Sequence, residues 1–199
     1  MITLDIRDNF PEVKRQLSEM GDSLGNKAMA RALNATITQG RTEMARRISR
    51  EYMLTSAQVK DRLEVTRAKS NNLGLEAVLS ASNKGKGRSM NLIAFVEKKV
   101  TLAEAKRRAK KGTLKQIQFQ IKRKGGLKII PGAFIGNHGR TVFIRVGKGR
   151  LPIKALSTID VPQMFNAKRI NEVVRQVMLD KFEVNFDREA RAVLLGYVK

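Results

Sequence analysis

The residues most able to do chemistry lie in the stretch 129–153, IIPGAFIGNHGRTVFIRVGKGRLPI, which combines five glycines with four Lys or Arg side chains. Glycine-rich basic loops bind phosphate in nucleotide-binding proteins, where the Walker loop follows the pattern G-x-x-x-x-G-K-[ST]. With that pattern aligned on Lys148, Val142 stands where the first glycine is required and Gly149 where the hydroxyl is required. The stretch is therefore not a Walker loop, and we expect its glycines to form turns between strands.

The single histidine, His138, lies in the sequence GNHGR, where Asn137 and Gly139 predict a tight turn. One imidazole in a chain without cysteine cannot build a histidine-based or thiolate-based metal site. Glu183 and Asp187 are one helical turn apart beside basic residues, which favours surface ion pairing over acid–base catalysis. The sequence therefore predicts no enzyme, no metal and no cofactor. A small hydrolase centred on His138 is kept as an alternative.

The elements that position these residues begin with helices. Alternating apolar residues predict an edge strand at the start of the chain, and a capping box that begins at Asn9 predicts a helix after it. Apolar residues at helical spacing predict a long helix over 27–52, in which Gly40 marks a close helix crossing. A short helix is predicted after the cap at 55–58.

Strand patterns dominate the middle of the chain. Residues 73–81 alternate with period two and predict a strand. Residues 83–89 predict the turn of a long hairpin, and residues 90–96 predict its return strand. A basic helix is predicted over 100–111, and two more strands over 117–121 and 142–146. The glycine turns described above would then join the later strands to one another.

Asp160 and Pro162 open a predicted C-terminal helix with an apolar stripe. The stripe consists of Ile170, Val173, Val174, Val177, Phe182, Phe186, Ala190, Val193 and Leu194. Helices and strands do not alternate regularly, so the fold class is α+β, an antiparallel-rich sheet packed by N-terminal helices and a long C-terminal helix. The predicted organisation is a single domain, 1–199, with a basic hairpin and helix appendage at 83–128.

The charge of the chain is +22, since 40 Lys and Arg oppose 18 Asp and Glu. Such an excess favours an anionic partner, whether nucleic acid, an acidic protein surface or a membrane. The longest apolar runs are far shorter than the roughly 20 residues that cross a bilayer, so we expect no transmembrane helix. The absence of cysteine fits assembly in a reducing cytoplasm.

More than half of this excess is concentrated between Lys84 and Lys128, where fifteen Lys or Arg oppose only Glu97 and Glu104. The candidate contacts to DNA or to a partner protein are Lys84, Lys86, Arg88, Lys106, Arg107, Arg108, Lys110, Lys111, Lys122, Arg123 and Lys124. Aromatic residues for base stacking do not interleave with them, so any nucleic-acid contact would be independent of sequence. The alternative is that this region is a solvated hairpin whose lysines keep the protein soluble.

Four motifs, PGAFI, VFIRV, GKGRLPI and ALSTIDVPQMF, resemble the minor tail protein Z or tail-completion family of bacteriophages and prophages, which is related to head–tail connector proteins. The likeness is strongest over residues 129–166 and is only architectural elsewhere. It is carried by Pro131, Gly132, Ala133, Phe134, Arg145, Arg150, Leu151, Pro152 and Ile153. Thr158 and Ile159 stand where a Gly-Pro pair is common in the family, which leaves the subfamily open.

The resemblance implies a structural protein of the virion that is assembled in the bacterial host cytoplasm and lies at the head-proximal end of the tail. It implies a homo-oligomeric ring, a hexamer, that contacts other tail or head–tail connector proteins, with viral DNA as a nonspecific partner and no membrane. We expect exposed sheet edges and the C-terminal helix to join neighbouring subunits. The alternative is a sequence-nonspecific nucleic-acid-binding protein that uses residues 84–128.

Overall fold

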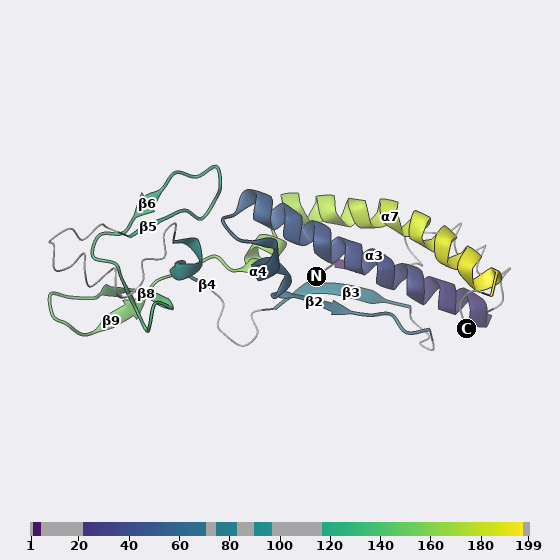
Figure 1. The fold of residues 1–199 in the computed structure, drawn as a ribbon, viewed down its shortest axis with the longest axis horizontal. Coiled ribbons are helices and arrows are strands. Elements are labelled where there is room, and N and C mark those ends of the chain that lie inside the picture. The colour runs from purple at the N-terminus through teal and green to yellow at the C-terminus, as the bar shows by residue number, and fades with distance from the viewer. Residues whose placement is uncertain (1, 5–21, 71–74, 83–89, 97–116, 197–199) are drawn as a thin grey trace. The chain divides into compact units, whose positions relative to one another are not determined.

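The computed structural model describes residues 2–4, 22–70, 75–82, 90–96 and 117–196 (Figure 1). The predicted helix after Asn9, the turn at 83–89 and the basic helix over 100–111 lie outside these residues. The chain divides into two compact units. The first unit comprises residues 1–48, 56–82 and 162–199, and the second comprises residues 49–55 and 83–161. The predicted single domain with an appendage at 83–128 stays a prediction.

The first unit consists of two long helices on a small sheet. Helix α3 (Asp22–Glu51) confirms the predicted long helix and begins five residues earlier than expected. It lies beside α7 (Lys168–Leu194), and both helices run along the sheet (Figure 1). The sheet has the order β1 (Ile2–Leu4), β3 (Ala77–Ala81), β2 (Leu63–Thr66), with antiparallel pairs throughout. The first strand is therefore an edge strand, as predicted.

The two helices are antiparallel and pack through an aliphatic and aromatic stripe. The buried residues of α3 in this stripe include Met29, Leu33, Ile37 and Met44, and those of α7 include Ile170, Val174, Met178, Phe182 and Phe186. Gly40 lies at the crossing, since a Cβ atom built there would be 2.8 Å from Cγ of Met178. Only glycine leaves room for this approach without movement of Met178, which confirms the predicted close crossing.

Hydrogen bonds of polar side chains also connect the elements of the first unit. The amide of Asn185, which is buried, donates to the hydroxyl of Thr36 at 2.9 Å. Asn34 forms a paired contact with the backbone of Ala68, which ties α3 to the segment after β2. Because buried polar groups are costly when they lack partners, these contacts select one register between the elements.

The second unit is built from short antiparallel strand pairs. Its largest sheet has the order β7 (Phe134–Gly136), β8 (Thr141–Arg145), β9 (Ile153–Ala155). The strands β4 (Met90–Asn91) and β10 (Ser157–Thr158) form one pair, and β5 (Gln118–Phe119) and β6 (Lys128–Ile129) form another.

The core of the second unit centres on Val142 of β8, which is fully buried, and on Leu92 and Phe95 of the short 3-10 helix η1 (Leu92–Phe95). The side chain of Asn91 accepts from the N–H groups of Ile93 and Val142, at 3.0 Å in each case. One amide side chain thereby caps η1 and fixes it against the central strand.

Two predictions about the elements are wrong. The predicted strands 73–81 and 90–96 do not form a hairpin: β3 is the middle strand between β1 and β2, and β4 pairs instead with β10. Only residues 90–91 of the predicted second strand are a strand, because residues 92–95 form η1. The C-terminal helix is not continuous, because α6 (Val161–Phe165) ends before α7 begins, and Ala167 between them has an extended backbone. The other short helix, α4 (Ser56–Lys60), occurs where predicted.

The α+β fold class is confirmed by these helices and antiparallel sheets. The apolar stripe of α7 is largely as expected, although Val173 and Leu194 are exposed and Met178 is a buried member that the pattern had not included. No helix in the described part of the chain has the length and apolar character needed to span a membrane.

Candidate functional site

The two units differ sharply in charge. The second unit contains 21 of the 40 Lys and Arg residues but only four of the 18 Asp and Glu residues, so its charge is +17 and that of the first unit is +5. No acidic residue occurs in the sequence between Glu104 and Asp160. The positive charge of residues 84–128 therefore continues along the sequence through the strands β7, β8 and β9. The missing acidic residues were the signal that could have revealed this extension.

Ion pairs occur in both units. In the described residues of the first unit, Arg31 and Arg188 both pair with Glu189, at 2.7 and 2.9 Å. Burial alone would raise the pKa of Glu189, but hydrogen bonds from Arg31 and Arg188 outweigh that effect and lower it. In the second unit, Lys122 and Glu51 form a long ion pair, at 3.9 Å.

The predicted contacts Lys122, Arg123 and Lys124 lie in the turn after β5, and they are not equivalent. Arg123 donates from its backbone N–H to the carbonyl of Glu51 at 2.8 Å and from Nε to the carbonyl of Ser49 at 2.7 Å. It thus satisfies carbonyls at the C-terminal end of α3, where cations are favourable. Arg123 and Lys124 are both exposed, but Arg123 also holds this turn against the end of α3. The eight other predicted basic contacts, from Lys84 to Lys111, lie outside the described residues.

The residues of the family-like motif lie in and around the β7–β8–β9 sheet. Pro131, Gly132 and Ala133 form the turn before β7, with φ of 76° at Gly132, as the predicted glycine turn requires. Phe134 on β7 lies 6.0 Å from Phe143 between ring centroids. Since Phe134 is only partly buried, its predicted anchoring in the core is incomplete.

The end of this sheet carries both cationic and apolar side chains at its surface. The guanidinium of Arg145 lies 5.1 Å from the ring centroid of Phe134, a cation–π contact. Arg150 and Pro152 are exposed in the loop between β8 and β9, and Leu151 is 71% exposed. Ile153 begins β9 at 38% exposure. The motif therefore brings cationic and apolar side chains together at the surface.

His138 lies in the turn between β7 and β8, where Asn137, His138 and Gly139 all have positive φ values. The predicted tight turn is confirmed, and the imidazole is exposed. Among the described residues there is no group of three or more His, Asp or Glu side chains that could hold a metal ion. The geometry around His138 is that of a surface turn.

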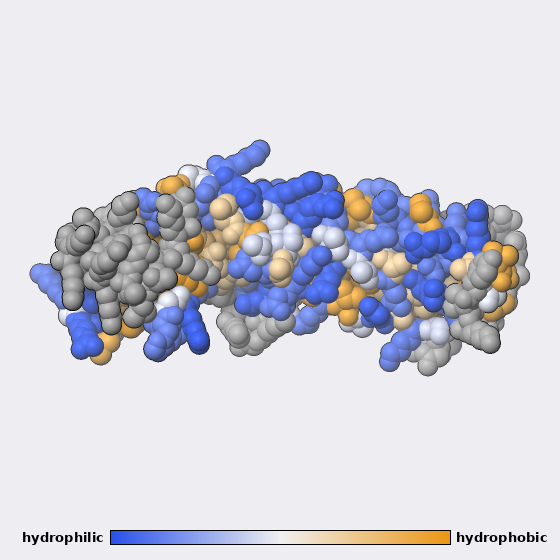
Figure 2. Space-filling model, in the orientation of Figure 1, coloured by the Kyte–Doolittle hydropathy of each residue, from blue (hydrophilic) through white to orange (hydrophobic). Residues whose placement is uncertain are grey.

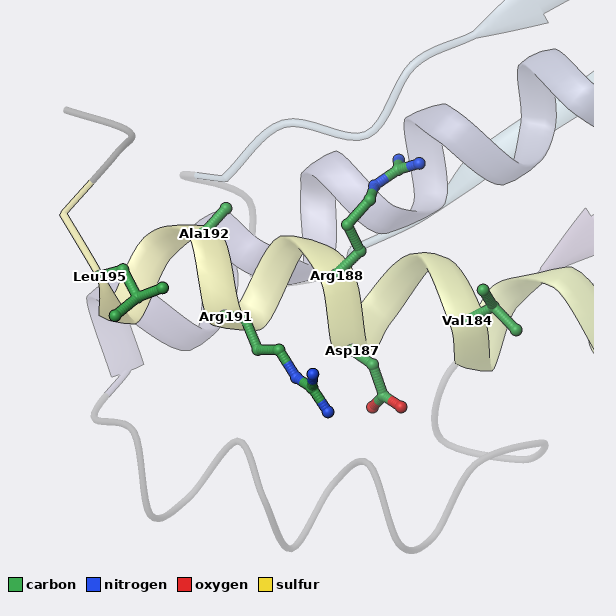
Figure 3. A pocket seen from close by; sticks show the side chains of 6 residues that line it. All are labelled: Val184, Asp187, Arg188, Arg191, Ala192 and Leu195. Carbon is green, nitrogen blue, oxygen red and sulfur yellow. The ribbon is translucent and has the colours of Figure 1, made fainter.

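A second surface lies at the end of α7. Figure 3 shows a shallow pocket along this helix, with the side chains of Arg188 and Arg191 directed to different sides. The pocket is lined by Val184, Asp187, Arg188, Arg191, Ala192 and Leu195. Val184 and Leu195 are 65% and 68% exposed. On the face in Figure 2, hydrophilic residues predominate and hydrophobic ones form small, separate patches.

Open strand edges and exposed cationic and apolar side chains are features of proteins that act by assembly. The chain matches the family model described as prophage minor tail protein Z (GPZ) over residues 11–195. The chain belongs to this family, and the resemblance seen in residues 129–166 is confirmed. It is a structural component of the phage tail and thus of the virion. Neither a curated protein nor a solved structure shows a significant match to the chain.

Proposed function

We propose that this tail protein forms a homo-oligomeric ring, a hexamer, at the head-proximal end of the tail and enables the tail to join the head. The observation that supports the proposal best is the unequal charge of the two units. Copies that met through their second units, each at +17, would repel one another. Self-association is therefore assigned to the first unit, and the second unit is left to face DNA or an acidic neighbour in the tail or connector.

The end of α7 offers a surface for that self-association. Val184, Leu194 and Leu195 are each more than 60% exposed there, and burial of such side chains between subunits is favourable. Asp187 and Arg191, one helical turn apart, supply opposite charges on the same surface. A neighbouring copy could thus bury apolar area without bringing like charges together.

Size-exclusion chromatography with light scattering tests the ring. A stable oligomer is expected, and it should persist or strengthen as salt is added, because salt screens the repulsion between the second units. Leu195→Asp should dissociate it. The matched control is Leu127→Asp, since Leu127 is 49% exposed but lies in the second unit. A strict monomer at every concentration and salt level would count against the proposal.

The alternative function is sequence-nonspecific nucleic-acid binding, favoured by the uninterrupted positive stretch between Glu104 and Asp160. Its affinity for duplex DNA should fall steeply with salt, by about 0.9 logarithmic units per neutralised phosphate. The informative variant reverses the charges of Lys106, Arg107, Arg108, Lys110 and Lys111. Loss of DNA affinity with an intact oligomer would favour this alternative over assembly alone.

A further inference from the structure

The outer edge of β9 is a surface that the proposed ring does not use. Two hydrogen bonds to β8 show which backbone groups of this segment face β8 and which face away. The N–H of Leu156 donates to the carbonyl of Val142, and the N–H of Val146 donates to the carbonyl of Pro152. Bonding alternates along an antiparallel pair, so Lys154, which lies between these two contacts and opposite Ile144, directs its backbone groups toward β8. Beyond β9, the carbonyl of Leu156 accepts from the N–H of Leu92 instead. The neighbours of Lys154 in β9, Ile153 and Ala155, direct their backbone groups away from β8.

Ile153 and Ala155 are these outward-directed residues. Among the described residues β9 pairs only with β8, so the N–H and C=O groups of Ile153 and Ala155 form an open strand edge. Both residues are exposed. Such an edge is a template for the addition of a strand from another chain.

The charge around this edge disfavours the β9 strand of a second copy as its occupant. Lys154 lies at the centre of β9, and Arg145, Lys148 and Arg150 lie next to it in the hairpin. Antiparallel pairing of two β9 strands about their centres would place two Lys154 residues opposite each other, and like charges in that position are destabilising. The cationic surroundings favour an acidic occupant.

The apolar side chains of the hairpin favour a protein over nucleic acid. Val146 and Leu151 are 65% and 71% exposed, and Ile153 is 38% exposed. Protein–DNA interfaces are more polar than this, whereas the centres of protein–protein interfaces combine apolar residues with arginine.

We propose that the edge of β9 binds an extended acidic segment of another tail or head–tail protein by strand addition. Ile153 is level with Arg145 on one face of the sheet, and Lys154 lies on the other face. The added strand would thus place apolar residues beside Ile153 and Ala155 and an acidic residue beside Lys154. That the segment belongs to a tail or head–tail protein rests on the proposed function. The open edge of β9 and the positive charge around it do not depend on that proposal.

Fluorescence anisotropy with a labelled peptide tests this binding on the full chain. The probe is a peptide of alternating valine and glutamate, about ten residues long, which is the upper range of strand length. Proline at an edge position whose N–H faces solvent is compatible with a strand. Ala155→Pro should weaken peptide binding about tenfold or more, because it removes an outward donor. Ala155→Val keeps that donor and is the matched control, which should bind as the wild type does.

A second measurement uses the wild-type protein and therefore does not depend on the folding of a variant. The same peptide with alternate backbone amides N-methylated should bind about tenfold more weakly, because it cannot complete the strand ladder. The proposal is overturned if Ala155→Pro and N-methylation leave binding unchanged. It is also overturned if Ala155→Pro removes binding of a duplex DNA oligonucleotide instead, or abolishes self-association, since the occupant would then be nucleic acid or a second copy.

Light scattering on the same samples separates this inference from the ring. If the wild-type protein is monomeric but Ala155→Pro still loses the peptide, the ring is wrong and the binding edge stands. If the oligomer forms and the peptide does not bind, the ring stands and the edge is wrong.

Discussion

The crossing of α3 and α7 yields a quantitative prediction through Gly40. Replacement of this glycine by alanine in a helix interior ordinarily stabilises by about 1 kcal/mol. Here the new Cβ would lie 2.8 Å from Cγ and 3.1 Å from Cε of Met178, well inside the usual 3.5–4.0 Å contact. Overpacking of this kind costs about 1–3 kcal/mol. The cost should exceed the gain, so we expect Gly40→Ala to lower the free energy of unfolding by about 1 kcal/mol.

A double-mutant cycle isolates the contact. Met178→Ala alone should cost about 2–5 kcal/mol, as for other buried methionines. In that background Gly40→Ala has nothing to collide with and should stabilise by about 1 kcal/mol, so the coupling free energy is about 2 kcal/mol. Thr42→Ala, at an exposed position of α3, is the control and should show no coupling to Met178.

Urea denaturation followed by far-UV circular dichroism measures these free energies. If Gly40→Ala stabilises the protein equally with and without the Met178 side chain, the two helices do not cross closely at this position. The packing of the first unit described above would then be wrong.

The remaining predictions concern pH, packing and charge. The pKa of Glu189 is lowered in the fold, so the ionised carboxylate stabilises the folded state at pH values above its ordinary pKa of 4.5. This stabilisation is lost as the pH falls through the lowered pKa. Glu189→Gln should therefore weaken the pH dependence of the unfolding free energy at acid pH, as measured in urea melts. Phe182→Ala, at a fully buried position, should cost about 3–5 kcal/mol in the same assay. If DNA binds the second unit, charge reversal of Lys124 and Arg150 should make the affinity less dependent on salt. The slope of log K against log salt should fall by about 0.9 for each phosphate that is no longer neutralised. An unchanged slope would exclude these two residues as DNA contacts. His138→Ala should leave oligomeric state and DNA affinity unchanged, and a change in either would contradict its surface position.

The long helices could be predicted because their apolar residues recur with the period of a helix over many turns. The close crossing could be predicted from Gly40, because this glycine lies on the apolar stripe of α3, where the partner helix packs. The partner of β3 could not be predicted, because a period-two pattern identifies a buried face and carries no information about which strand is adjacent. The break before α7 was missed because Asn166 and Ala167 include neither glycine nor proline.

The candidate site was predictable only in part. The cluster of Lys and Arg was visible in the sequence, but which cations serve the fold was not: Arg123 is fixed by carbonyls of Ser49 and Glu51, which are remote in sequence. The edge of β9 is open because the backbone N–H and C=O groups of Ile153 and Ala155 point away from β8. Pairing with β8 decides which backbone groups of β9 face outward, and this cannot be read from the residues of β9 themselves.

Cryo-electron microscopy of the intact phage particle tests the proposed assembly most directly. We expect a closed ring of this chain at the head-proximal end of the tail, with neighbouring subunits in contact through their first units. We also expect the second units to face DNA or an acidic neighbour. A single copy of the chain, a position elsewhere in the tail, or subunits joined through their second units would contradict the proposed assembly.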